Sequence, residues 1–202
     1  MTKVPPTPDL PAFPDQRFSH HVPVWWSNTL VLLIEGAAFA TLVVTYFYIR
    51  RNIDPWPPTG ILPDLGISTI NVAVLVVGIF PMWHVAHLVM RPENSRMLGY
   101  WLAACVAFGL AATILRVLEF KTVHATWRGN AYGAIVWSIL AVHLAHILAA
   151  TLETLVLAFL MLRGPADEKL FADVRINAVY WYFVALSWVA LYTMVFLTPR
   201  FL

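Results

Sequence analysis

Residues 32–51 read LLIEGAAFATLVVTYFYIRR, an apolar run interrupted by a single carboxylate, Glu35. About 20 apolar residues is the length that an α-helix needs to cross the ~30 Å hydrocarbon core of a bilayer. A charged side chain inside that core costs about 2.5–3.5 kcal/mol on insertion scales, so it persists only where it faces protein, water or a partner. The stretch therefore predicts a membrane-spanning helix, with Glu35 as its first candidate functional residue.

The composition of the whole chain is that of a membrane protein. Of its 202 residues, 60% are hydrophobic and 12% are charged, against roughly 25% charged in soluble domains. The net charge is only +2, and the aromatic residues lie inside apolar runs rather than among lysines and arginines, which argues against a nucleic-acid partner. The single cysteine, Cys105, excludes a disulfide framework or a multi-cysteine metal site built from this chain alone.

Five apolar segments follow one another along the chain, at residues 24–50, 67–90, 97–120, 131–162 and 176–198. Backbone polar groups must be satisfied inside lipid, so these segments predict an all-α bundle of five transmembrane helices. We expect a proline-rich N-terminal tail at 1–23 and one transmembrane domain at 24–202. The basic residues do not fix the orientation, because a cytoplasmic N-terminus places seven of the 13 inside and six outside.

Polar residues within the apolar segments are the candidate functional residues. Gly36 and the alanines near it would let a neighbouring helix approach and enclose Glu35. We expect either a neutral acid that donates one interhelical hydrogen bond or a group that takes part in proton uptake. Arg116 and Glu119 lie three residues apart near the end of the third segment, so they share a helix face and predict a local ion pair close to the membrane interface.

Two His-x-x-His pairs raise the possibility of a metal site. They are His84 with His87, and His143 with His146; Glu153 lies seven residues beyond His146. Such residues on helices can build a bis-histidine haem site or a di-iron site. We prefer hydrogen-bonded or interfacial histidines, because no Glu-x-x-His motif is present. No phosphate loop, nucleotide fingerprint or Ser-His-Asp set occurs, so we expect no catalytic centre in this chain.

Four further motifs follow the opening stretch. The chain reads WPPTGI at 56–61, LEF at 118–120, NAYGAIVWSILAVHLAHI at 130–147 and VYWYFVALSW at 179–188. In order and spacing, these motifs resemble subunit III of the haem-copper terminal oxidases, in its short five-helix form. The resemblance runs from about Trp26 to the C-terminus.

The resemblance matches specific residues of this chain to positions of the family's motifs. The matched intramembrane polar residues, expected to serve structure, lipid or proton transfer, are Glu35, Glu119, His143 and His146. The matched motif residues are Trp56, Pro57, Pro58, Tyr132, Gly133, Tyr180, Trp181 and Trp188. The chain departs from the family pattern at Tyr182 and Ala185, where the family has histidine and aspartate, at Arg116, where glutamine is common, and at Glu153, where apolar or small residues are usual.

What the resemblance implies is a non-catalytic accessory subunit with no redox centre of its own. In the family, haem and copper lie in partner subunits, and this subunit packs mainly on subunit I, with subunit II and small subunits nearby. It holds phospholipids between its helices, stabilises the catalytic subunit and supports proton uptake during oxygen reduction.

For this chain, the resemblance predicts a bacterial inner-membrane protein with a cytoplasmic N-terminus and a periplasmic C-terminus. Among the complexes that the resemblance allows, we rank a cytochrome c oxidase first. A quinol oxidase and a nitric oxide reductase-associated homologue remain alternatives, as does a stand-alone membrane haem or di-iron protein.

Overall fold

The computed structural model describes residues 21–89, 95–164 and 167–201, and these residues fold almost entirely as helices, without a strand. Five helices are long and apolar enough to cross a membrane: α1 (His21–Arg51), α2 (Gly66–Leu88), α3 (Ser95–Thr122), α4 (Ala131–Arg163) and α5 (Glu168–Tyr192). A π-helical turn (Thr193–Leu197) and the short α6 (Thr198–Phe201) continue α5. The predicted all-α fold with five membrane-spanning helices is confirmed.

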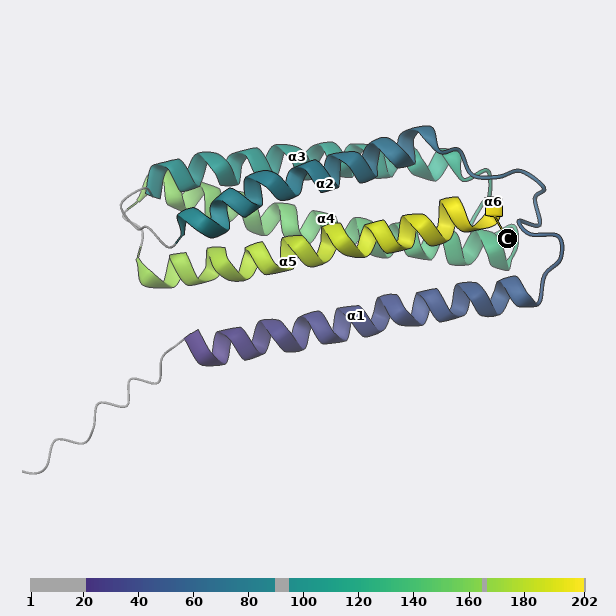
Figure 1. Cartoon of the computed structure of the whole chain (residues 1–202), viewed down its shortest axis with the longest axis horizontal. Coiled ribbons are helices and arrows are strands. Elements are labelled where there is room, and N and C mark those ends of the chain that lie inside the picture. The colour runs from purple at the N-terminus through teal and green to yellow at the C-terminus, as the bar shows by residue number, and fades with distance from the viewer. Residues whose placement is uncertain (1–20, 90–94, 165–166, 202) are drawn as a thin grey trace, which may run out of the picture.

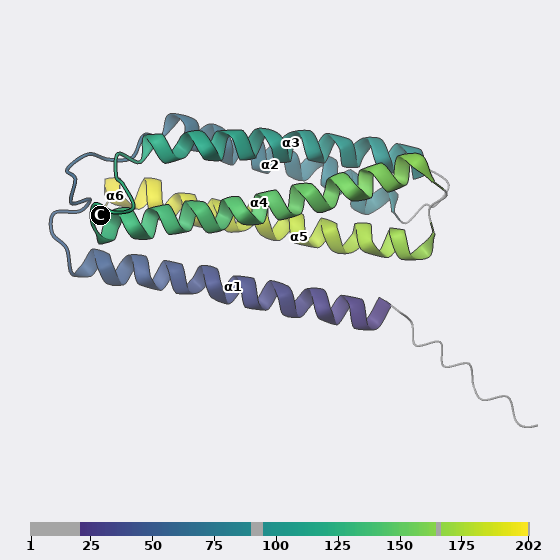
Figure 2. The same cartoon turned by 180° about the vertical axis from the view of Figure 1, so that it is seen from behind.

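The five long helices lie side by side, each antiparallel to its neighbour in the chain (Figures 1 and 2). Helices α2 to α5 form a closely packed unit, and α1 lies along its side against α4 and α5. The beginning of α1, the end of α4 and the beginning of α5 lie at one end of the bundle, called here the α4–α5 end (Figure 1). The α1–α2 connection, the α3–α4 connection and the C-terminal residues lie at the opposite end.

The bounds of the helices differ from the predicted segments mainly at α5. The predicted fifth segment starts at residue 176, whereas α5 starts at Glu168. Asp167 caps this helix, because its side chain accepts a hydrogen bond from the backbone N–H of Leu170 at 2.8 Å. The first turns of α5 are charged, so hydropathy alone places the start too late. Helix α1 begins at His21, inside the segment predicted as a tail; residues 1–20 lie outside the described residues.

Helix α3 packs closely on α4 because small residues lie at the contact. A Cβ atom added at Gly109 would overlap the side chain of Thr151, and one added at Gly99 would come within 2.7 Å of Leu162. Small residues of this kind let two helix backbones approach each other closely. Such packing matters in a membrane, because the hydrophobic effect does not drive helices together in lipid. Gly99 and Gly109 thereby allow a close contact of α3 with α4.

Helix α1 is the least buried of the five long helices. Its buried apolar side chains are Phe39 and Tyr46. Gly36 approaches α5, since a Cβ there would lie 3.9 Å from Phe183, but the alanines that follow it (Ala37, Ala38 and Ala40) are exposed. Gly36 thus meets a neighbouring helix, as expected of the small residues around Glu35, whereas the three alanines stay exposed. Their face of α1 is available to lipid or to another subunit.

Candidate functional site

Glu35 lies on the side of α1 that faces α4 and α5. The hydroxyl of Tyr180 on α5 donates a hydrogen bond to Oε1 of Glu35 at 3.4 Å. Nε2 of His146 on α4 lies 3.7 Å from Oε2, slightly beyond hydrogen-bond distance. The Glu35 side chain is still 24% exposed. The carboxyl group thus lies between α1, α4 and α5, while part of the Glu35 side chain remains exposed.

The backbone contact of His146 fixes where its first proton lies. Nδ1 of His146 lies 2.6 Å from the carbonyl oxygen of Val142, and a carbonyl only accepts, so Nδ1 carries a proton. Nε2 then presents a lone pair to Glu35 when the ring is neutral, and an N–H when the ring is charged. The ring of His146 thus directs Nε2 toward the Glu35 carboxyl group.

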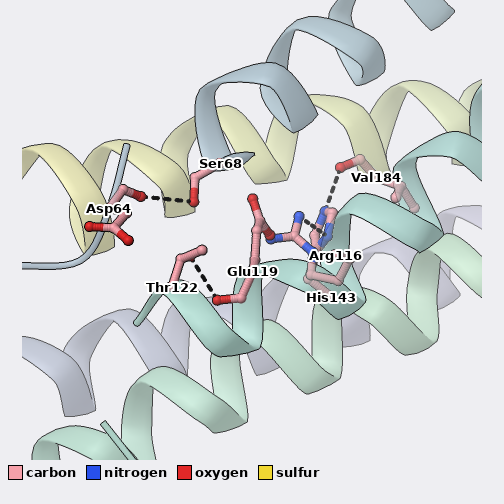
Figure 3. A network of polar contacts seen from close by, with 7 residues as sticks. All are labelled: Asp64, Ser68, Arg116, Glu119, Thr122, His143 and Val184. Atoms are coloured by element: carbon pink, nitrogen blue, oxygen red, sulfur yellow. Dashed lines mark hydrogen bonds and ion pairs between the residues drawn. The ribbon is translucent and has the colours of Figure 1, made fainter. Parts of the chain in front are cut away.

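A second polar network lies deeper in the bundle (Figure 3). Arg116 and Glu119 of α3 form an ion pair, and both side chains are fully buried. Nη2 of Arg116 lies 3.2 Å from Nδ1 of His143, whose Nε2 lies 3.0 Å from the carbonyl oxygen of Val184 on α5. The guanidinium also stacks on Trp188, with its central carbon 3.3 Å from the ring centroid. The predicted pair is present, and the surrounding helices enclose both of its side chains.

These contacts determine the state of His143. The carbonyl of Val184 accepts, so Nε2 of His143 carries the proton, and Nδ1 must accept from Arg116, which only donates. The ring is therefore neutral, and both of its nitrogens are engaged. Protonation of Nδ1 would place a second cation against the guanidinium. His143 acts as a bridge between α3 and α5.

Polar side chains surround the acid of this network. Ser68 and Asn71 of α2 are fully buried and lie beside the Glu119 carboxylate. The hydroxyl of Thr122 donates to the backbone oxygen of Glu119 at 2.9 Å. The hydroxyl of Ser68 donates to the backbone oxygen of Asp64 at 3.4 Å (Figure 3). A buried ion pair offsets its desolvation only when further hydrogen bonds surround it. The hydrogen bonds of the network therefore connect α3, α4 and α5, and polar side chains of α2 lie beside its acid.

The histidines considered as metal ligands lie at separate places. His143 turns toward α3, His146 turns toward α1, and the ring of Phe39 lies near both, with centroid distances of 6.1 and 4.8 Å. His84 and His87 each contact a backbone oxygen of their own helix, α2. Over the part of the chain that the structure describes, no three His, Cys, Asp or Glu side chains converge as metal ligands.

The WPP motif fastens the end of α1 to the start of α4. The ring of Trp56 packs edge-on against Tyr46 and Tyr132, at centroid distances of 5.3 and 4.8 Å. Its Nε1 donates to the hydroxyl of Tyr46 at 3.3 Å. At Gly133 a Cβ would overlap the backbone carbonyl of Thr126, so only glycine fits. These motif residues lie at the end of the bundle opposite the α4–α5 end.

The motif residues of α5 serve different contacts. Tyr180 and Trp188 belong to the two polar networks already described. Trp181 is buried and, with Ala185, lines a small apolar cavity of about 10 Å³ between α2, α4 and α5. Ala185 occupies the position where the resemblance expects an aspartate. Tyr182 is only partly buried. The polar contact expected from this part of the motif is thus replaced by apolar packing.

One polar contact between α4 and α5 was missed from the sequence. The hydroxyl of Thr154 lies 3.0 Å from Oδ1 of Asn177, and both side chains are fully buried. Glu153, the neighbour of Thr154, is exposed and lies beside Asn177. The spacing of Asn177 and Tyr180, three residues apart on one helix face, was the available signal.

Comparison with known proteins identifies related chains. The family model described as cytochrome c oxidase subunit III matches residues 22–199. The chain is 26% identical over 174 residues to cytochrome c oxidase subunit 3 of Thermostichus vulcanus, which covers 85% of this chain and 86% of that protein. It is 28% identical over 175 residues to the protein of the same name from Petromyzon marinus, which covers 83% of this chain and 66% of the relative. The family match includes all five long helices.

Proposed function

Because this chain belongs to the cytochrome c oxidase subunit III family, we propose that it is a non-catalytic accessory subunit of a bacterial haem-copper oxygen reductase, a cytochrome c oxidase. It works in aerobic respiratory electron transport beside subunits that hold haem and copper. Subunit I is its main contact and subunit II a further partner. The complex lies in the inner membrane, with the N-terminus of this chain in the cytoplasm and its C-terminal end in the periplasm.

The buried network supports an accessory role. Arg116, Glu119 and His143 are fully buried, and their polar groups bond mainly to one another and to the backbone. Groups held in this way keep helices in one arrangement. The engagement of Glu119 and His143, two of the family-matched polar residues, with Arg116 is the observation that carries the proposal: their chemistry is used to hold the bundle that supports the catalytic subunit.

Glu35 is the family-matched residue that supports a role in proton uptake. It is partly exposed, and it lies next to an imidazole with which it can exchange one proton. An ionisable residue in a membrane-spanning segment is a candidate for proton transfer. We assign Glu35 and His146 the task of taking up and releasing protons near the proton entrance of the catalytic subunit.

The exposed side of α1 supports the binding of phospholipid. Trp25 and Trp26 are 56% and 57% exposed at the beginning of the helix, where aromatic residues favour the level of the headgroups. Leu33 and Ile34 continue this apolar face. Acyl chains of bound phospholipid lie along this face in the proposed complex.

The identity of the complex is tested by purifying the tagged chain from native membranes in mild detergent. We expect a haem-copper subunit I and a subunit II to co-purify, with the pigment spectrum of an oxidase that turns over with reduced cytochrome c. Turnover with quinol only, or a copper-free nitric oxide-reducing partner, would reassign the complex. A preparation that contains this chain but no haem-copper subunit would refute the proposal.

The chain expressed alone tests the stand-alone alternative. We expect it to be colourless and free of iron. A haem band or bound iron that is lost in His143→Ala or His146→Ala would support a separate metalloprotein instead.

A further inference from the structure

Glu153 is an ionisable residue that the proposed function leaves unexplained. It is exposed on α4, on a face where Leu152, Leu155 and Val156 are also exposed. It lies ten residues before the last residue of α4, or about 15 Å along the helix axis. A carboxylate on such an apolar face is costly unless it has a polar neighbour or a function.

The neighbours of Glu153 form a polar stripe on α5. Asp173, Asn177 and Tyr180 follow one another at i, i+4 and i+7, so they lie on one face of the helix. Glu153 lies beside Asn177 and close to both Asp173 and Tyr180. The stripe leads from the α4–α5 end of the bundle to Tyr180, which donates its hydrogen bond to Glu35. Carboxyl, amide and phenol groups therefore succeed one another over about 10 Å of α5.

A buried amide in the middle of the stripe is directed toward Glu153. Asn177 is fully buried, and its Oδ1 faces the hydroxyl of Thr154 at 3.0 Å. Its Nδ2 has no hydrogen-bond partner among the described residues and lies on the side of Glu153. A buried N–H₂ group without an acceptor is unfavourable. It offers a donor to the Glu153 carboxylate or to a water that carries a proton along the stripe.

Beyond the stripe, the polar groups continue from Tyr180 to Glu35 and end at His146. Beyond it, the ring of Phe39 lies near both His146 and His143. Both nitrogens of His143 are engaged, and the next group is the guanidinium of Arg116. A guanidinium only donates hydrogen bonds and cannot accept a further proton, so proton transfer does not continue past Arg116. The polar groups near Glu35 are thereby separated from the buried network that leads toward the opposite end.

We propose that Asp173, Glu153, Asn177 and Tyr180 form a one-sided access lane through which Glu35 exchanges protons with the α4–α5 end of the bundle. The lane rests on the proposed proton role of Glu35 and gives it a route. Among the described residues, titratable groups that face it are Glu35 on α1, His146 and Glu153 on α4, and Asp173 and Tyr180 on α5. Since Phe39 and Arg116 close the inner end, the lane delivers protons to Glu35 without connecting the two sides of the membrane.

The test is the hydrogen–deuterium exchange rate of the Glu35 carboxyl group in the purified complex. Infrared difference spectroscopy follows its C=O band, which is assigned by its loss in Glu35→Gln. We expect Glu153→Gln, and independently Asp173→Asn, to slow the exchange roughly tenfold or more, because each removes one positioned proton carrier. Glu168→Gln, an exposed acid at the same end, and His124→Gln at the opposite end are the matched controls and should leave the rate unchanged.

Three outcomes would overturn the lane: no exchangeable Glu35 band, an unchanged rate in both lane variants, or equal slowing by His124→Gln. Oxygen reduction and proton pumping are measured in the same preparations. If Glu35→Gln changes neither while Glu153→Gln still slows the exchange, the lane stands and the proton-uptake role in the proposed function fails. The two proposals are therefore separable.

Discussion

At the scale of single residues, the ion pair of Arg116 and Glu119 predicts the sharpest loss of stability. Removing one partner of a buried pair costs about 3–5 kcal/mol, because the other charge stays buried without compensation. Arg116→Gln also takes away the donor to Nδ1 of His143. We expect this variant to unfold at a lower temperature and to be lost from the purified complex. Arg128→Gln, at an exposed arginine, is the control and should behave like the unchanged chain.

A double variant distinguishes the pair from general damage. Arg116→Gln combined with Glu119→Gln leaves two neutral amides that can bond to each other and to Ser68. Part of the lost thermal stability should return. A double variant no more stable than Arg116→Gln alone would show that the pairing of the charges is not the cause.

At Ala185 we expect the stability of the bundle to fall when a polar side chain is introduced. It lines an apolar cavity together with Leu75, Ile147 and Trp181. Ala185→Asp restores the acid expected at this position from the family pattern, but places it among apolar side chains. Even as a neutral acid, the new side chain should lower the free energy of unfolding by about 1–3 kcal/mol. The measurement is the unfolding temperature of the complex, which should fall. Ala185→Ser should cost less, since a serine hydroxyl can bond to the backbone of its own helix; equal losses would argue against this reasoning.

Sequence spacing was informative about pairs within one helix and poor on contacts between helices. The i, i+3 spacing correctly predicted that Arg116 bonds to Glu119. The same spacing of His143 and His146 did not predict that they contact different helices, α3 and α1. A helix face is broad enough to meet two neighbours, and one sequence does not tell which helix packs against which edge. Burial of the ion pair and the contact of Tyr180 with Glu35 stayed hidden for that reason.

At the scale of helices, the contact of α3 with α4 predicts a strict requirement at Gly109. A Cβ there would overlap Thr151, so Gly109→Ala should separate the two helices and cost about 1–3 kcal/mol. Thr151→Ala in the same chain removes the overlapping atoms and should recover most of this loss. Gly66→Ala is the matched control, because a Cβ there meets nothing within 4 Å. Thermal unfolding of the complex measures all three, and a failure of Thr151→Ala to rescue would contradict the steric explanation.

The existence of the five helices could be predicted because each needs an apolar run long enough to span the bilayer. The start of α5 could not, since it depends on the cap of Asp167 and on charged first turns that hydropathy does not count. The loose packing of α1 was also hidden. Lipid and protein are equally apolar neighbours, so an apolar run does not reveal which of them covers it.

At the scale of the whole molecule, the direction of the bundle in the membrane decides whether the access lane can serve proton uptake. Basic residues are balanced between the two sides, so the sequence leaves the direction open. Two single cysteine substitutions address the two ends: Glu168→Cys at the α4–α5 end and Arg128→Cys at the opposite end, both at exposed residues. The native Cys105 is buried and should react little with a membrane-impermeant maleimide. Labelling of the unsubstituted chain measures this background.

With the N-terminus in the cytoplasm, Arg128→Cys should be labelled in intact spheroplasts, and Glu168→Cys only after the membrane is permeabilised. Protons for oxygen reduction would then be taken from the side on which Asp173 and Glu153 begin the lane. The reverse labelling pattern would place the lane on the periplasmic side, where a closed inner end at Phe39 and Arg116 would keep Glu35 from receiving cytoplasmic protons. The labelling pattern therefore tests the orientation of the bundle and, with it, whether the lane opens on the side from which protons are taken up.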